Sequence, residues 1–240
     1  MPGVHSGNLI LVNARHPLTE QRRPLLAPAI PGSGVLLESH AAAMLTGALG
    51  RIGALGDIVP VSGWRSRREQ QEIWYSTMAE SGGEFTRKYV ALPGCSEHET
   101  GLAIDLALRA EEIDFIRPDF PRDGVCGRFR AIAADYGFIE RYPAGKEHIT
   151  GIAAEPWHFR YVGRPHAHLM AELGLTLEEY VELLRSYPYP GGVLSTESGG
   201  YGADIGFTSS YEPSLAPSTP YQVSGNNVDG YILTLWRLPA

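Results

Sequence analysis

The stretch CSEHETGLAIDLAL, residues 95–108, places a carboxylate, Asp105, seven positions after His98 and inside an apolar run. Alternation over 102–108 predicts a buried strand, with leucine and isoleucine on one face and Asp105 among small residues on the other. An isolated buried carboxylate is costly, so Asp105 needs a cation or hydrogen-bond donors. Gly101 permits a sharp turn that swings His98 back over the same face. On these residues alone, an exposed edge-strand aspartate with an unrelated surface histidine is an equally good interpretation.

A second stretch, EPWHFRYVG at residues 155–163, brings Glu155 three positions before His158, which stands between the aromatic residues Trp157 and Phe159. Its alternation predicts a half-buried strand. Residues three apart on a regular strand face opposite sides, so the two side chains can serve one site only if the backbone at 154–156 bends or bulges. Pro156 favours such a break. The alternative for Glu155 is a surface carboxylate at the entrance of the strand.

Together the two stretches supply a ligand set for zinc. His98, Asp105 and His158 would hold the ion with water in the fourth position, and zinc lowers the pKa of that water towards ~7. Glu155 would take the proton of the water and pass it to a leaving amine. The sequence SGWRS puts Arg65 at a predicted strand end, where its guanidinium can stabilise charge that develops on a carbonyl oxygen. The alternative for Arg65 is a surface position at the start of an arginine-rich helix.

Composition places the chain among ordinary globular proteins. Of its 240 residues, 43% are hydrophobic and 20% are charged, and the formal net charge is −7. The negative charge and the lack of a Lys/Arg run argue against a nucleic-acid partner. No apolar run approaches the ~18 residues of a transmembrane segment. The N-terminal sequence shows no secretory signal, so we expect a cytoplasmic protein unless a signal has been removed.

The two cysteines, Cys95 and Cys126, are expected to be free thiols in a reducing cytosol. A disulfide that closes a loop of ~30 residues is the minority interpretation. The sequence leaves this pairing and the oligomeric state open.

The chain divides into two parts that differ in composition and in sequence pattern. Residues 1–190 alternate helical and strand patterns, and one helix is expected from an N-cap at Ser66 to the glycine pair at 82–83. Residues 191–240 form an extension rich in Gly, Ser, Pro and Tyr that ends in a strand pattern at 230–238. A strand at the end of such a segment indicates that the extension returns to the sheet. We therefore predict a catalytic domain over 1–190 and an extension that packs on it.

The motifs also resemble those of a known family. SEHETGLAID fits the pattern S-x-H-x-x-G-x-A-x-D, and EPWH fits E-x-x-H, as in the zinc D-Ala-D-Ala peptidases of the VanX, VanY and VanXY type. The resemblance begins near LVNARHPL, includes SGWRS, ends near Tyr187 and covers roughly three quarters of the chain. It implies an α+β fold, in which helices flank a small central antiparallel sheet and a zinc site occupies a cleft on the sheet.

The resemblance also implies roles for individual residues. It gives the zinc ligands as His98, Asp105 and His158. Glu155 is then the catalytic base, Arg65 matches the arginine that stabilises the transition state, and Ser96 is the motif serine near the substrate. We also expect Arg65 and Trp157 to contact the substrate.

Activities within the family divide between dipeptidases, carboxypeptidases and bifunctional members. The PWHFRYVG context resembles the carboxypeptidase and bifunctional branch, and the missing signal resembles the soluble members. The resemblance therefore predicts a soluble D,D-carboxypeptidase that removes D-Ala from peptidoglycan precursor peptides, that can also hydrolyse the D-Ala-D-Ala dipeptide, and that favours glycopeptide (vancomycin) resistance. Two alternatives remain open. One is a zinc peptidase for another cell-wall bond such as L-Ala-D-Glu, and the other is a non-catalytic zinc module that binds cell-wall peptides.

Overall fold

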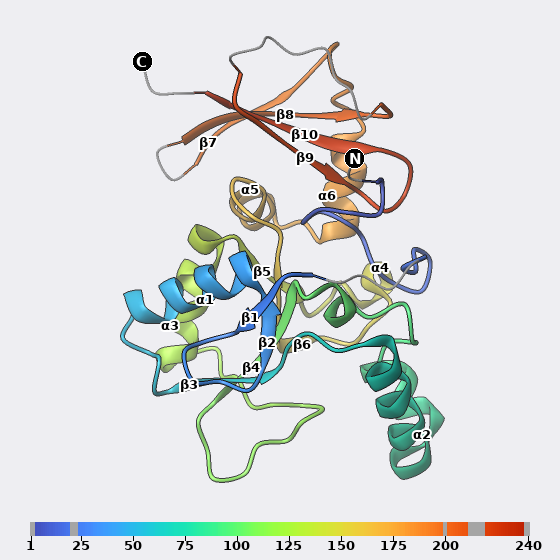
Figure 1. Ribbon diagram of the computed structural model, residues 1–240, viewed down its shortest axis with the longest axis vertical. Coiled ribbons are helices and arrows are strands. Elements are labelled where there is room, and N and C mark those ends of the chain that lie inside the picture. The colour runs from blue at the N-terminus through green and yellow to red at the C-terminus, as the bar shows by residue number, and fades with distance from the viewer. Residues whose placement is uncertain (1–2, 20–23, 199–200, 211–218, 238–240) are drawn as a thin grey trace.

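A four-stranded antiparallel sheet forms the centre of the molecule. Its strands, in spatial order, are β3 (Ile58–Ser62), β4 (Ala103–Leu108), β6 (Glu155–Tyr161) and β5 (Phe138–Tyr142). All three strand pairs are antiparallel. The computed structural model describes residues 3–19, 24–198, 201–210 and 219–237. Helices and a central antiparallel sheet together confirm the expected α+β class (Figure 1).

The remaining elements surround this sheet. The helical segments are α1 (Ser39–Arg51), α2 (Arg67–Tyr89), η1 (Glu97–Thr100), α3 (Gly124–Ala133), η2 (Ala134–Tyr136), α4 (Glu147–Thr150), α5 (His166–Leu173) and α6 (Leu177–Leu184). The remaining strands are β1 (Leu26–Pro28), β2 (Leu36–Glu38), β7 (Leu194–Ser198), β8 (Tyr201–Thr208), β9 (Tyr221–Gly225) and β10 (Tyr231–Arg237). Among the described residues, none of the helices combines the length and the apolar character that crossing a membrane requires.

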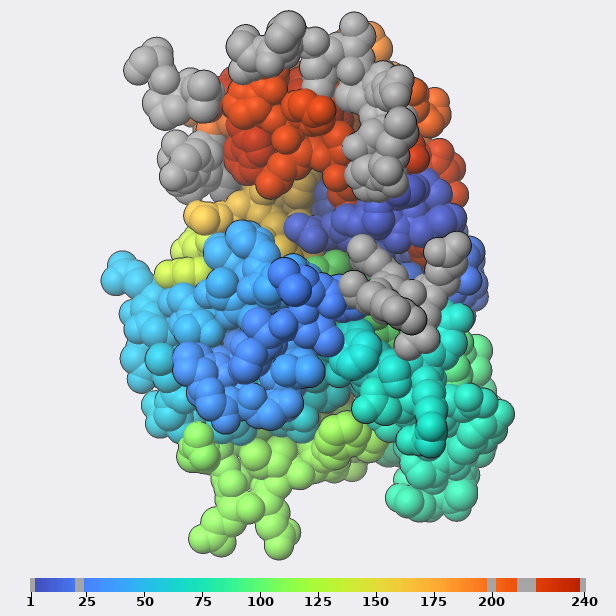
Figure 2. Space-filling view, in the orientation of Figure 1, coloured from blue at the N-terminus to red at the C-terminus, as the bar shows by residue number. Residues whose placement is uncertain are grey.

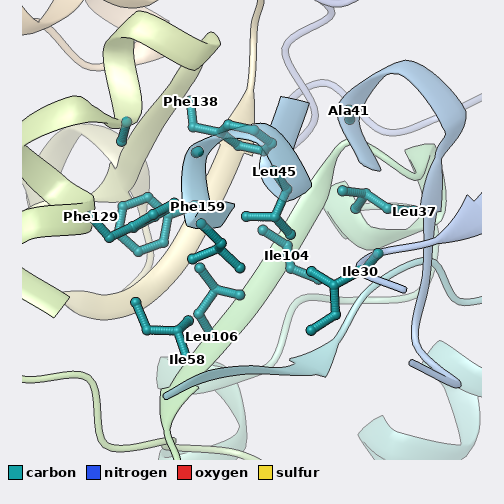
Figure 3. Close-up of a cluster of buried hydrophobic side chains, with 14 of the residues drawn as sticks. Ile30, Leu37, Ala41, Leu45, Ile58, Ile104, Leu106, Phe129, Phe138 and Phe159 are labelled. Atoms are coloured by element: carbon teal, nitrogen blue, oxygen red, sulfur yellow. The ribbon is translucent and has the colours of Figure 1, made fainter. Parts of the chain in front are cut away.

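One face of the central sheet carries the main hydrophobic core. The β4 side chains that the alternation assigns to this face, Ile104 and Leu106, pack with residues of α1 and α3 (Figure 3). Phe129 and Phe159 meet edge to face with their ring centroids 5.0 Å apart. Full burial of a side chain of this size stabilises the fold by about 1.5–3 kcal/mol. This packing fixes which face of β4 is left for Asp105.

The C-terminal extension forms a second sheet and does not join the first. Its strand order is β7-β8-β10-β9, so the expectation that the final strand returns to the central sheet is wrong. The physical reason is that β10 finds partners on both sides within the extension, pairing antiparallel with β8 and with β9. The strand itself, Tyr231–Arg237, lies where the pattern at 230–238 placed it.

The second sheet packs on the rest of the chain through a shared cluster of apolar side chains. Ile205 and Ile232 of this sheet join Leu177 and Tyr180 of α6 and Leu9 of the N-terminal segment. Figures 1 and 2 show the N-terminal segment, in dark blue, between the C-terminal sheet and the central part of the molecule. The proposed division into a domain over 1–190 and an extension stays a prediction.

Helix α2 differs from its expected length. Ser66 caps it through a capping box with Glu69, as its position before the helix predicts. The first helical segment ends at the glycine pair as predicted, and a second segment continues from there to Tyr89. Gly82 has φ 81° and ψ 166°, outside the helical range, and so marks a kink between two helical segments. The Thr86 hydroxyl in the second segment donates to the Gly82 carbonyl over 2.8 Å.

Candidate metal centre

His98 is directed towards Asp105 by a turn and by a backbone carbonyl. It lies in η1, which ends at Gly101 in the left-handed conformation with φ 75°. The Nδ1–H of His98 donates to the Gly63 carbonyl over 2.8 Å. Its Nε2 then lies 3.1 Å from Asp105 Oδ2. The sharp turn that Gly101 was expected to permit is therefore present, and the two side chains meet.

His158 approaches Asp105 from the neighbouring strand. Asp105 and His158 are paired residues of β4 and β6, so their side chains extend from the same face. His158 Nδ1 lies 2.9 Å from Asp105 Oδ1. Potential ligand atoms of His98, Asp105 and His158 all lie within 4.8 Å of one another. These three side chains, which are 4–6% exposed, form a compact buried cluster.

The donor chemistry of this cluster fits a bound cation. A neutral imidazole carries one N–H, and that of His98 is used on the Gly63 carbonyl. Its Nε2 therefore presents a lone pair to the Asp105 carboxylate, which also offers only lone pairs. Two facing acceptors need a proton or a metal ion between them. Two ring nitrogens and one carboxylate oxygen suit zinc in the arrangement of catalytic sites, which keep one position open.

Glu155 reaches the same site because β6 bulges. Glu140 of β5 pairs with Phe159, whereas Tyr142 pairs with Glu155, so two residues on β5 correspond to four on β6. The backbone of β6 is irregular between Phe159 and Glu155, so strict alternation no longer decides the side on which Glu155 emerges. Its Oε2 lies 3.7 Å from His158 Nδ1. The bend expected around Pro156 is thus present, and it removes the conflict between strand alternation and a shared site.

Electrostatic effects separate the ionisable groups of the site. Burial opposes ionisation of Asp105, but the His98 and His158 rings outweigh it and hold the Asp105 pKa well below its usual range. Burial lowers the pKa of His158, yet Asp105 raises it to about 9. Burial and the Arg65 charge lower the pKa of His98 to about 4. Burial raises the pKa of Glu155 to about 8, against the attraction of His158. The site therefore combines an ionised carboxylate with a carboxyl group that exchanges protons near neutrality.

Arg65 and Ser96 border the cavity in front of this cluster. Arg65 follows β3, and its backbone N–H donates to the His98 carbonyl over 3.3 Å. Its buried Nε has no hydrogen-bond partner among the described residues. Ser96, 3% exposed, precedes η1. Both residues line the cavity, as do His98, Asp105, Glu155 and His158.

Trp157 is placed differently from the expectation that it contacts substrate. It is 8% exposed and belongs to the hydrophobic core cluster. It is absent from the described residues that line the cavity. The reason is the alternation of β6, which sends Trp157 to the core face and its neighbour His158 to the site.

The cavity has further walls that sequence reasoning missed. Gln70 donates through Nε2 to the Ala91 carbonyl over 2.7 Å, and its buried Oε1 has no hydrogen-bond partner among the described residues. Phe115 and Ile116, in the loop after β4, also line the cavity. No local pattern marks these positions, because they meet the site through the path of a loop and a helix.

A group of buried charges behind His158 was also missed. Glu97, Arg141 and Arg160 are at most 1% exposed. A signal for them existed, since Arg141 and Arg160 stand beside aromatic residues in strand patterns that predict burial. A buried charge requires a partner, so two such arginines predict a buried acid.

The two cysteines are free thiols, as expected. Cys126 is buried in the core, and Cys95 is partly exposed.

The sequence of this chain is similar to those of known proteins. The family model described as VanY: D-alanyl-D-alanine carboxypeptidase matches residues 39–164. The bifunctional D-Ala-D-Ala dipeptidase and D-Ala-D-Ala carboxypeptidase VanXYC of Enterococcus gallinarum is 42% identical over 73% of this chain and 94% of its own length.

Two solved structures are also similar to this chain. One is the structure of the vancomycin resistance D,D-dipeptidase VanXYg in complex with a D-Ala-D-Ala phosphinate analog. It has 44% sequence identity and a TM-score of 0.92, and the match covers 98% of this chain and 95% of the VanXYg chain. A mutant of the D,D-pentapeptidase VanY from the VanB-type resistance cassette, in complex with Zn(II), is 30% identical with a TM-score of 0.60 over 72% of this chain and 98% of its own.

Proposed function

This chain belongs to the VanY family of D-alanyl-D-alanine carboxypeptidases, and we propose that it is a zinc-dependent D,D-carboxypeptidase that also hydrolyses the D-Ala-D-Ala dipeptide. Its substrates would be peptidoglycan precursor peptides that end in D-Ala-D-Ala, the termini on which glycopeptide antibiotics depend. The observation that carries the proposal is the buried Asp105 carboxylate between two imidazole nitrogens at 2.9 and 3.1 Å, with Glu155 beside it.

The proposed metal set is His98, Asp105 and His158. Zinc bound there would polarise the scissile carbonyl and make water a nucleophile near neutral pH. The VanY mutant solved in complex with Zn(II) supports zinc as the ion. We do not assign a fourth ligand from the protein, because an open position is what a hydrolytic site requires.

Glu155 is the group that we assign to proton transfer. It would accept a proton as the oxygen of water bonds to the carbonyl carbon. It would return that proton to the amine nitrogen as the C–N bond breaks, so that D-Ala leaves with a neutral amine. A carboxyl whose pKa is raised by burial to about 8 is matched to both half-steps near neutrality.

Arg65 and Ser96 are assigned to substrate binding. The guanidinium of Arg65 is charged, half-buried and without a hydrogen-bond partner at Nε among the described residues. Such a cation would stabilise the oxyanion that forms when water adds to the carbonyl. Ser96 lies at the cavity wall, where its hydroxyl would hydrogen-bond a small polar substrate. Trp157 is left out of this assignment because it lies in the core.

The test separates metal binding from chemistry. Wild-type protein should bind about one zinc per chain and release D-Ala from a pentapeptide precursor. Glu155→Ala should retain zinc and lose ~10²–10⁴-fold in kcat, the range for a lost general base. His98→Ala should lose both zinc and activity. Glu72→Ala, an exposed glutamate on α2, is the matched control and should behave as wild type. Full activity in the Glu155 variant would overturn the mechanism.

A panel of cell-wall peptides decides between the alternatives. Cleavage of an L-Ala-D-Glu bond without release of D-Ala would replace the proposed substrate, and zinc binding without any hydrolysis would leave a binding module. The ratio of the rates on the dipeptide and the pentapeptide tells whether the protein acts mainly as a dipeptidase, mainly as a carboxypeptidase, or as both. A cytoplasmic location stays a prediction, which cell fractionation would check.

A further inference from the structure

Glu97 is a buried carboxylate whose two oxygens have different surroundings. Oε1 accepts from Arg141 Nε over 2.8 Å and lies 3.0 Å from Arg160 Nη1. Oε2 lies 3.6 Å from His158 Nε2. Neither Glu97 Oε2 nor His158 Nε2 has a hydrogen-bond partner among the described residues. Each of these two buried polar atoms therefore faces the other.

The two arginines that hold Glu97 are themselves anchored outside the central sheet. Arg141 forms a two-pronged ion pair with Glu178 of α6, at 2.7 and 2.8 Å. Arg160 Nη2 donates to the carbonyls of Asn8 and Ile10 in the N-terminal segment, at 3.0 and 3.1 Å. Arg141 and Arg160 are fully buried. Planar guanidinium groups held at both ends leave Glu97 little freedom to rotate.

Glu97 is ionised in this setting. Its Oε1 lies 2.8 Å from Arg141 Nε and 3.0 Å from Arg160 Nη1, and two buried guanidinium groups at these distances hold the carboxylate in its charged form. An ionised carboxylate can accept but not donate. The group that faces His158 Nε2 is therefore an acceptor with a fixed position.

We infer that Glu97 is a positioning residue that keeps the proton of His158 on Nε2 and so leaves Nδ1 free to face Asp105 and a metal ion. A neutral imidazole has one N–H, and an acceptor behind one nitrogen selects the tautomer in which the other is the ligand. The tautomer of His98 is selected in the same way by a different acceptor, because its Nδ1–H donates to the Gly63 carbonyl. One histidine is thus oriented by a neutral carbonyl and the other by a carboxylate. The inference rests on the proposed zinc site.

The tautomer can be measured directly in the wild-type protein. In zinc-loaded protein labelled with ¹⁵N at histidine, long-range proton–nitrogen NMR spectra should show His158 with a hydrogen on Nε2 and with Nδ1 shifted by the metal. A ligating Nε2, or a hydrogen on Nδ1, would overturn the inference. This measurement needs no variant and therefore does not depend on whether a substitution folds.

Zinc affinity provides the second measurement. Glu97→Gln keeps the size of the side chain but weakens the acceptor, so zinc affinity in a chelator competition should fall ~10–100-fold, the range for lost partners of metal-binding histidines. Glu178→Gln is the matched control, because it disturbs the same Arg141 but does not contact His158. Because Arg141 is one of two arginines that hold Glu97, the Glu178 variant should lower the melting temperature of the metal-free protein but should lower zinc affinity less than Glu97→Gln does.

The outcomes separate this inference from the proposed function. Equal losses of zinc affinity in Glu97→Gln and Glu178→Gln would mean that the network acts through stability alone, and the inference would fail. An unchanged affinity in a folded Glu97→Gln variant would have the same consequence. Wild-type protein that binds no zinc, or that releases no D-Ala, would instead remove the proposed function on which the inference rests.

Discussion

At the scale of single residues, three buried histidines show how surroundings decide the role of one side chain. His98 and His158 each offer a ring nitrogen to Asp105. His166 is equally buried, yet both of its ring nitrogens face hydroxyl groups, those of Tyr180 at 2.8 Å and Thr234 at 3.0 Å. It therefore has no nitrogen left for a metal ion. No local sequence pattern marks this buried link between α5, α6 and β10.

His166 should make stability depend on pH. Burial lowers its pKa to about 3, below the 6.5 of an exposed histidine. Between these values the unfolded chain binds a proton that the folded chain does not, so stability is full above pH 6.5 and falls as the pH drops towards 3. The slope for one such group is about 1.4 kcal/mol per pH unit. Urea unfolding at pH 7, 6 and 5 should give a shallower decline for His166→Gln than for wild type. Parallel profiles would show that His166 does not set this dependence.

At the scale of elements, the site depends on where β3 ends. Gly63 lies directly after β3, and a Cβ built on it would lie 2.1 Å from the Leu36 carbonyl oxygen of β2 and 2.8 Å from the Val35 side chain. The Gly63 carbonyl also accepts the hydrogen bond that orients His98. A glycine is therefore required here by the close approach of two backbone segments.

Gly63→Ala should lower both stability and zinc affinity. The methyl group would force β2 away from β3, at a cost of about 1–3 kcal/mol for overpacking, and would shift the carbonyl that holds His98. Gly50→Ala is the matched control, because a Cβ there meets nothing within 4 Å inside α1. It should stabilise the protein by about 0.5–1 kcal/mol. Thermal unfolding of both variants checks the prediction, and equal melting temperatures would contradict it.

At the scale of the whole molecule, the N-terminal segment joins the two sheets. Leu9 lies in the shared apolar cluster. The Leu11 backbone N–H donates to the Asn226 carbonyl over 3.0 Å. Asn227, in the turn between β9 and β10, donates from Nδ2 to the carbonyls of Leu11 at 2.8 Å and His16 at 3.0 Å. Arg160 donates to the same segment, so the C-terminal extension and the candidate metal site both depend on the N-terminal segment.

Asn227→Gly should loosen this junction without straining the turn. Asn227 has φ 60°, which glycine adopts readily, so the variant loses the side-chain hydrogen bonds alone. Leaving buried carbonyls unpaired costs about 1–3 kcal/mol. Hydrogen exchange at the Leu11 amide should accelerate, and urea unfolding should occur at a lower midpoint. Ser195→Ala, an exposed change in β7, should leave both unaltered, and unchanged exchange in Asn227→Gly would refute the role.

The sequence by itself determined the local features of the site and the class of the fold. Alternation assigned Asp105 to the face of β4 opposite the core, and Gly101 and Pro156 marked the turn and the bulge that the site requires. These features depend on residues that are close in the chain, and so strand period and backbone freedom reveal them. The residue pattern then identified the family to which the chain belongs.

The tertiary structure alone decided the features that need distant partners. The size of the β6 bulge, the core position of Trp157 and the separate C-terminal sheet follow from pairing between strands far apart in sequence. The buried Glu97 and its two arginines lie on different elements and become one network on folding. Local periodicity carries no information on such contacts, because burial and charge pairing are properties of the packed chain.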